Sequence, residues 1–298
     1  MSAAQSDPID AQLLPLEGLR VVTLATNIPG PVAAAQLREW GCAVVKIEPP
    51  DGDLLATAAP AWYAHLHDGV DVVTLDLKAP LGRTMLDGHL AHADLLLTSS
   101  RPAALERLGL GWAILHQRFP NLCQVAIVGS PSPFTDKPGH DLTYVAAAGL
   151  VSPPALPMTV VGDLAGAANA ANTALALLLA RARGREASYG QVALDRAALE
   201  FARPLLHGLT RPGGLLGGGL PRYALYRSSD GWIALAALEE HFWRRTVQGL
   251  SLEIDADYAA LASAFVARKG AEWEIWAHDH DLPLVVVATP TFEASQRS

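Results

Sequence analysis

The chain has 298 residues, of which 50% are hydrophobic, and a formal net charge of -8 at pH 7. This length suits two domains with sizeable cores rather than one small domain. The acidic balance argues against a nucleic-acid partner and against an anionic membrane surface. Only 17% of the residues are charged, which is low for a globular surface, so we expect a homodimer that hides part of that surface.

Cysteine usage and the first residues bear on the compartment. Cys42 and Cys123 lie in apolar runs and are predicted to be buried free thiols in a reducing environment. Residues 1–15 contain two aspartates and no basic segment followed by an apolar core, so we expect a disordered tail and no signal peptide. The apolar stretch 164–180 is interrupted by two asparagines and a threonine, which indicates a buried helix rather than a membrane span. We therefore expect a cytoplasmic protein.

From residue 19 onward, β-branched runs alternate with helical segments. Strands are predicted at 19–25, 43–48, 71–77, 94–98 and 122–128. Helices are predicted at 32–40, 82–91, from about 102, and at 112–119. This alternation predicts an open, doubly wound α/β sheet, in which ligands bind beyond the carboxyl ends of the strands. The first turn lacks G-x-G-x-x-G, so a nicotinamide or flavin dinucleotide site has little support.

Three loops are expected to gather at that edge of the sheet. The first contains Pro31, which is well placed to open the helix at 32–40. The second contains Ser100, a candidate cap for a helix in which Pro102 takes an early position. The third contains His140. These loops are therefore the predicted walls of the ligand site.

In the second half of the chain the regular alternation of strands and helices ends. After the long helix we predict further helix to about residue 207, and then a Gly-rich linker or ligand-facing loop at 210–220. Residues 223–236 predict a hairpin that turns at SSDG. Helices at 240–250 and 257–280 and a strand at 284–288 follow. The predicted organisation is a large domain at 16–208, a linker at 209–222 and a small domain at 223–298.

Two segments carry the chemistry. The first segment is DKPGHDLTY at 136–144, a Pro-Gly turn that places His140 and Asp141 at the start of a helix. The second is VVGDLAG at 160–166, which places Asp163 at the N-terminus of the long helix. An imidazole and a carboxylate at helix mouths suit proton transfer or acyl transfer. Taken alone, Asp163 is equally compatible with an N-cap, and Asp141 is favoured as a cap over a catalyst. A lone His140 is more often a surface histidine.

The order of motifs resembles the class III coenzyme A transferase (CaiB/BaiF) family, across residues 16 to 290. The segments that carry the resemblance are LEGLRVV at 16–22, GP at 30–31, WGCAVVKIEPP at 40–50, LDLK at 75–78, RPAALERLGLG at 101–111, PGHD at 138–141 and GD at 162–163. Within the family, PGHD and ALE at 237–239 are most similar to the α-methylacyl-CoA racemase branch. The resemblance implies a Rossmann-like large domain, a smaller α+β domain and an interlocked dimer.

The resemblance also implies site residues. His140 and Asp163 would be the two proton-transfer groups, and Glu239, from the same chain or from a partner subunit, would support them. The alternative for Glu239 is that it simply starts its helix. Racemisation of an acyl-CoA needs a neutral base on one face of the α-carbon and a protonated acid on the other. Burial must then raise the pKa of Asp163, and backbone N–H groups at the mouth of its helix are candidate donors to the enolate.

Coenzyme A, as the acyl-CoA substrate, is the implied ligand. Arg101 is the first candidate for its phosphates because a guanidinium matches phosphate oxygens. Lys46 is the second candidate, and Pro31 is expected to line the same site. The histidines show no spacing that suits a metal with a carboxylate or cysteine partner, so no metal is expected.

Three functions remain open. The preferred one is an acyl-CoA racemase or epimerase acting on a 2-methyl-branched thioester. The second is a CoA transferase in which Asp163 attacks the thioester and forms an acyl–aspartyl anhydride. The third is a homologue that binds CoA or a partner protein without chemistry. It is motivated by the segment at 65–71, which lacks the Lys and Arg usual in the family, and by the chain end at Ser298.

Overall fold

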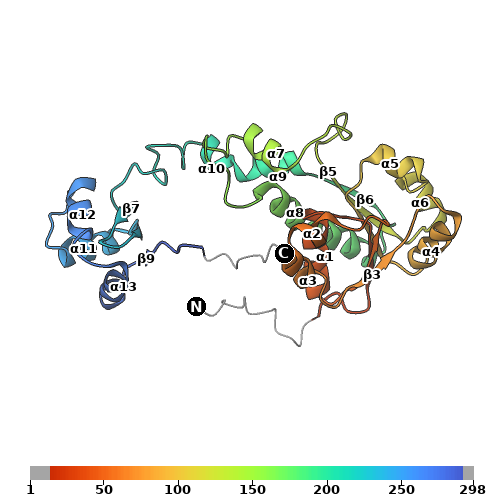
Figure 1. The fold of residues 1–298 in the computed structure, drawn as a ribbon, viewed down its shortest axis with the longest axis horizontal. Helices are drawn as coiled ribbons and strands as arrows, with labels where there is room; N and C mark the ends of the chain where they lie inside the picture. Colours follow the sequence, from red (N-terminus) through yellow and green to blue (C-terminus); the bar gives the residue numbers. More distant parts are fainter. Residues whose placement is uncertain (1–13, 291–298) are drawn as a thin grey trace. The chain divides into compact units, whose positions relative to one another are not determined.

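The computed structural model describes residues 14–290 (Figure 1). The chain divides into two compact units, with the boundary between Ala202 and Arg203. The segment expected to be a linker, 209–222, belongs to the second unit. The expected N-terminal tail at 1–15 lies outside the described residues, apart from Leu14 and Pro15.

The first unit is built on a six-stranded parallel sheet in the order β3-β2-β1-β4-β5-β6. Its strands are β1 (Arg20–Thr23), β2 (Ala43–Glu48), β3 (Asp71–Thr74), β4 (Leu95–Thr98), β5 (Cys123–Val128) and β6 (Tyr189–Ala193). The chain winds outward from β1 to β3 on one side and from β4 to β6 on the other. The switch point therefore lies between β1 and β4. This arrangement confirms the predicted doubly wound α/β class.

Helices cover both faces of this sheet (Figure 1). They are α1 (Pro29–Glu39), α2 (Leu54–Ala58), α3 (Pro60–Leu66), α4 (Pro80–Leu90), α5 (Pro102–Arg107), α6 (Trp112–Arg118), α7 (Asp141–Ala147), α8 (Val161–Ala182) and α9 (Leu194–Phe201). Successive strand residues point to opposite faces, so Val21 packs in the core with α1 and α8, and Val22 packs in the core with α4 and α6. Cys42 and Cys123 are free and buried, as predicted.

Helix α8 is long and apolar enough to cross a membrane by length and composition alone. In the structure it is a core helix that packs against α1, α9 and strands β5 and β6. Small side chains make this close packing possible, and its buried residues are Gly162, Ala165, Gly166, Ala167, Ala170, Ala171, Ala174 and Leu178. The prediction of a buried helix is confirmed.

Several local predictions were wrong. Strand β6 lies in a segment predicted as helical. It is an edge strand in which only Val192 is buried, so its sequence gives no apolar alternation. Ser100 does not cap α5; the N-cap position is Arg101, since Pro102 is the first helical residue. Likewise α1 begins at Pro29 and contains Pro31 in its first turn. The short helices α2 and α3 were not predicted.

The second unit is a smaller α+β domain. Its antiparallel sheet has the order β7-β8-β9, formed by β7 (Tyr223–Arg227), β8 (Trp232–Ala236) and β9 (Leu284–Val286). Its helices are α10 (Arg203–Leu206), α11 (Glu240–Gly249), α12 (Tyr258–Phe265) and α13 (Gly270–Asp279). The predicted helix at 257–280 is thus two helices. Tyr226, Phe265 and Trp273 form the aromatic centre of its own core.

Candidate active site

A pocket of about 160 Å³ lies at the carboxyl edge of the large sheet. Thr26 and Asn27 line it from the loop after β1, Ser99 to Arg101 from the loop after β4, and Gly129 from the residue after β5. The pocket is therefore at the topological switch point, where a doubly wound sheet is expected to bind its ligand.

The structure brings His140 and Asp163 into the lining of this one pocket. His140 is the N-cap residue of α7, and its side chain is exposed. The Thr143 hydroxyl donates to the His140 carbonyl at 2.7 Å and accepts from the His140 N–H at 3.2 Å. These two bonds fix the backbone of His140 and leave its imidazole free to act on a ligand.

Asp163 lies in the first turn of α8, and the N-cap position belongs to Val160. The interpretation of Asp163 as the N-cap is therefore wrong. Burial, together with the neighbouring carboxylate of Asp141, raises the pKa of Asp163 to about 6, although His140 acts in the opposite direction. A carboxyl group with this pKa exchanges readily between acid and base near neutral pH.

Asp141 has a capping role that local sequence does not reveal. It is the first residue of α7, is 7% exposed, and its Oδ1 accepts a hydrogen bond from the Asp163 N–H at 3.0 Å. It therefore satisfies a free N–H of α8 rather than of its own helix. The Asp163 N–H, one of the donors expected to face an enolate, is used by this bond.

Positive charge is concentrated at the same pocket. Arg101 and Lys137 both line it and are exposed, so the lining offers two cations against one carboxylate that titrates near neutral pH. Lys137 was not among the predicted site residues, although it precedes the PGHD segment directly. Pro31 is buried inside the first turn of α1, and Pro29 lines the pocket in its place.

A second hollow of about 370 Å³ adjoins the pocket, because Thr26 and Ser100 line both. Much of its remaining wall is aliphatic, with Leu24, Ile47, Leu75, Leu77, Leu105 and Leu108. The same wall also carries three acidic residues, Glu48, Asp51 and Asp76. Lys78, from the LDLK segment, also lines it and is exposed. The aliphatic part of this lining suits an apolar or aromatic ring of a ligand.

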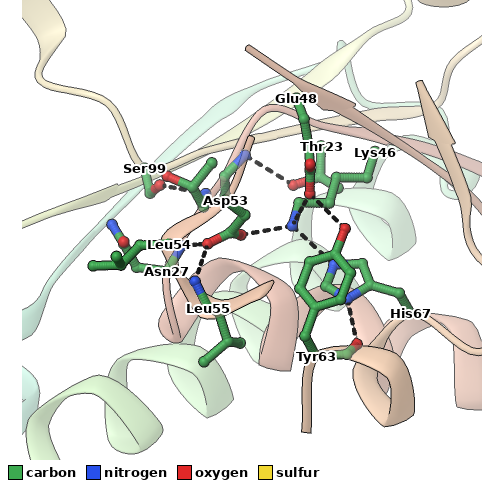
Figure 2. A network of polar contacts seen from close by, with 12 residues as sticks. Thr23, Asn27, Lys46, Glu48, Asp53, Leu54, Leu55, Tyr63, His67 and Ser99 are labelled. Atoms are coloured by element: carbon green, nitrogen blue, oxygen red, sulfur yellow. Dashed lines mark hydrogen bonds and ion pairs between the residues drawn. The ribbon is translucent and has the colours of Figure 1, made fainter. Parts of the chain in front are cut away.

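Lys46, the second candidate for phosphate binding, is instead part of a buried network (Figure 2). Its side chain is 1% exposed, and its Nζ lies 2.6 Å from Asp53 Oδ2 and 2.8 Å from Glu48 Oε1. The third neighbour is His67 Nε2, at 2.9 Å. Three acceptors match the three ammonium protons, so Lys46 has none left for a phosphate. The structure thus corrects the prediction for Lys46.

The protonation of His67 follows from its neighbours. Its Nδ1 lies 2.6 Å from the Tyr63 carbonyl oxygen, which only accepts, so Nδ1 carries the hydrogen and Nε2 accepts from Lys46. Burial lowers the pKa of His67, which keeps this neutral form. Tyr63 completes the network by donating to Glu48 Oε1 at 2.8 Å.

The network also holds one wall of the pocket (Figure 2). Asp53 Oδ1 accepts from the N–H groups of Asn27 and Leu55, both at 3.0 Å. Asn27 has a φ of 68°, in the left-handed region, which asparagine tolerates better than most non-glycine residues. The Thr26 N–H donates to Ser99 Oγ at 3.1 Å. The loop after β1 is therefore tied both to Asp53 and to the loop after β4.

Glu239 belongs to the second unit and lies at the N-cap position of α11. Its side chain is exposed and makes no capping hydrogen bond. Within residues 14–290, no group of three His, Cys, Asp or Glu side chains is close enough to hold a metal ion.

The comparisons with known proteins decide the family. Residues 16–294 match the model described as CoA-transferase family III. The chain belongs to this family. The resemblance seen in the sequence is confirmed, and the fold agrees with the family's solved members.

Curated members of CoA-transferase family III with similar sequences include two kinds of enzyme. Alpha-methylacyl-CoA racemase of Homo sapiens is 28% identical in an alignment 291 positions long, which covers 87% of this chain and 74% of the racemase. The mouse racemase is 30% identical over the same shares of the two chains. Succinyl-CoA–D-citramalate CoA-transferase of Chloroflexus aurantiacus is 27% identical over 79% of this chain and 65% of the transferase.

Two solved structures show the family fold. The Mycobacterium tuberculosis protein Rv3272 has a TM-score of 0.81 and 26% identity, covering 92% of this chain and 83% of its own. A CaiB/BaiF family protein from Brucella suis has a TM-score of 0.79 and 21% identity, covering 92% of this chain and 84% of its own, and supports the fold alone.

Proposed function

We propose that this protein is an acyl-CoA racemase or epimerase that moves the α-proton of a 2-methyl-branched acyl thioester. The observation that carries the proposal is that His140 and Asp163 line one pocket at the switch point of the sheet. The pKa of Asp163, raised to about 6, supports it further, because the same carboxyl group must act as acid in one direction and as base in the other.

In the proposed reaction one of these two groups takes the α-proton, and the C–H electron pair moves through the α-carbon onto the carbonyl oxygen. The resulting enolate is planar at the α-carbon. The other group then returns a proton to the opposite face, so the configuration is inverted and no atom is gained or lost. In this proposal Glu239 assists the pair from the second unit of the same chain or of a partner in a homodimer.

Coenzyme A is proposed to span both hollows. Its adenine would lie in the aliphatic hollow beside Leu75 and Leu77, and its phosphates near Arg101, Lys137 and Lys78. Its thioester would then reach the pocket that His140 and Asp163 line. This placement is supported by the walls that Thr26 and Ser100 share.

A CoA transferase is the second candidate. Above pH 6 the Asp163 carboxyl group is mostly ionised and can attack a thioester carbonyl to form an acyl–aspartyl anhydride, with CoA thiolate leaving. The Chloroflexus aurantiacus relative bears the name of such an enzyme. A homologue that binds CoA without chemistry is the third.

Incubation of 2-methylacyl-CoA in deuterated water, without an acceptor acid, separates these candidates. The racemase exchanges the α-hydrogen, which proton NMR detects, and His140→Ala and Asp163→Asn variants lose the exchange. No exchange, together with conversion of an added carboxylate into its thioester, would replace the racemase by the transferase. Calorimetric CoA binding without either reaction would leave the non-catalytic homologue.

A further inference from the structure

Tyr144 is a residue of the pocket that the sequence reasoning did not single out. It lies on α7, one turn after His140, and its N–H donates to the His140 carbonyl at 3.3 Å. The side chain is 8% exposed and lines the pocket together with His140 and Asp163. Within residues 14–290 its hydroxyl has no hydrogen-bond partner, and it is not one of the fully buried polar atoms. The hydroxyl is therefore open to the pocket and free to bond a ligand.

Two glycines make room for this hydroxyl group. A Cβ at Gly139 would lie 2.5 Å from Tyr144 Oη, and a Cβ at Gly129 would also collide with it. Gly129 follows β5 directly, and Gly139 directly precedes His140. The ring is therefore inserted between the end of a central strand and the loop that presents His140. Any side chain at either glycine would displace the hydroxyl from the pocket.

The charges around Tyr144 keep it protonated. Burial raises the pKa of Tyr144, and the carboxylates of Asp163 and Asp195 raise it further, while Arg101 opposes them. At neutral pH the side chain is therefore a hydrogen-bond donor. The Asp163 N–H already donates to Asp141 and is not available to a ligand oxygen. The Tyr144 hydroxyl can serve as the donor in its place.

We infer that Tyr144 is a catalytic residue whose hydroxyl donates a hydrogen bond to the carbonyl oxygen of the bound thioester. The inference rests on the proposed function and adds a role to it. When the α-proton leaves, the C–H electrons collect on that oxygen, and the hydroxyl stabilises the enolate without giving up its own proton. If Asp163 instead attacks the carbonyl carbon, the same donor faces the tetrahedral oxyanion.

The variant Tyr144→Phe tests the hydroxyl and keeps the ring that fills the space between the two glycines. We expect kcat for α-hydrogen exchange to fall about 100-fold, the effect typical of removing one oxyanion donor. KM and the calorimetric affinity for free CoA, which has no thioester, stay within about twofold. Tyr189→Phe is the matched control, because Tyr189 stands on the edge strand β6 outside this pocket. Exchange by Tyr144→Phe at the wild-type kcat overturns the inference.

A binding measurement tests the contact without turnover. Acetyl-CoA labelled with carbon-13 at the carbonyl should show a downfield-shifted resonance when bound to the wild type, because a hydrogen bond polarises the carbonyl group. In Tyr144→Phe the resonance should return toward the value in free acetyl-CoA. Equal shifts in both proteins overturn the role of Tyr144 even if the wild type is active. A shift that Tyr144→Phe abolishes, in a protein that catalyses neither reaction, would support the contact and refute the proposed function.

Discussion

Asp141 Oδ1 accepts a hydrogen bond from the backbone N–H of Asp163 at 3.0 Å, and so joins the starts of α7 and α8. One carboxylate thus fixes the helix start on which the other stands. The same contact brings two acidic groups together, which contributes to the raised pKa of Asp163. Burial is the larger cause of that pKa, and Asp141 adds to it while also fixing the geometry of the helix start.

The variant Asp141→Asn should lower the pKa of Asp163. The amide oxygen still accepts from the Asp163 N–H, but the negative charge is gone, so the carboxylate form of Asp163 becomes less costly. The acid limb of the pH profile for α-hydrogen exchange, expected near pH 6, should move to lower pH. Asp136→Asn, in the exposed part of the same loop, is the control. An unmoved limb would show that burial alone sets this pKa.

Asp163→Asn should change stability in a way that depends on pH. Because the pKa of Asp163 is raised from 3.8 to about 6 on folding, the folded state binds more protons between these values. Wild-type stability therefore falls as pH rises through this window and stays low above it. The variant has no such loss and should exceed the wild type by about 1–2 kcal/mol at pH 8, with no difference at pH 3. Urea unfolding at the two pH values measures this, and equal stability at both would contradict it.

Lys46→Met should cost stability, whereas Lys78→Ala should cost affinity. Removing the ammonium leaves the buried carboxylates of Glu48 and Asp53 without their cation, a loss of about 3–5 kcal/mol. Lys78 is exposed beside the aliphatic hollow, so its loss should weaken CoA binding about tenfold and leave the melting temperature unchanged. Thermal unfolding and calorimetry distinguish the two. A Lys46→Met protein with wild-type stability and weakened CoA binding would restore Lys46 as a phosphate ligand.

Arg101→Met and Lys137→Met should each weaken CoA binding about tenfold at low salt and flatten its dependence on ionic strength. The reason is that both cations line the pocket and are exposed, so they are available to phosphate oxygens. Arg185→Met is the control, since Arg185 precedes β6 and so stands at the amino edge of the sheet. Titration calorimetry at two salt concentrations makes the comparison. Affinity lost equally in all three variants would indicate a general charge effect and no specific site.

The sheet was largely predictable because its inner strands are continuous apolar runs, buried on both faces. The edge strand β6 was not, since Tyr189 and Gln191 face solvent. His140 and Asp163 were found from the family resemblance together with their positions near helix starts.

The contacts that tune the site were not predictable. Asp141 acts on a helix that begins twenty residues further along the chain, and Lys46 is neutralised by Asp53, which follows a turn. Tyr144 resembles an ordinary apolar position of a short helix in the sequence. Only the folded chain shows that two glycines leave its hydroxyl facing the pocket. Local patterns give the elements, whereas these roles arise from residues distant in sequence.

Thr26 and Ser100 belong to the walls of both hollows, and this shared border has a thermodynamic consequence. A single ligand that fills both hollows incurs the entropy cost of lost translational freedom once, whereas two separate fragments each incur it. The free energy of binding for an intact nucleotide thioester should therefore exceed the sum measured for its nucleotide and pantetheine fragments. A bulky side chain at Ser100 would block the passage between the two hollows. The affinity gained by linking the fragments would then be lost, although each fragment would still bind in its own hollow.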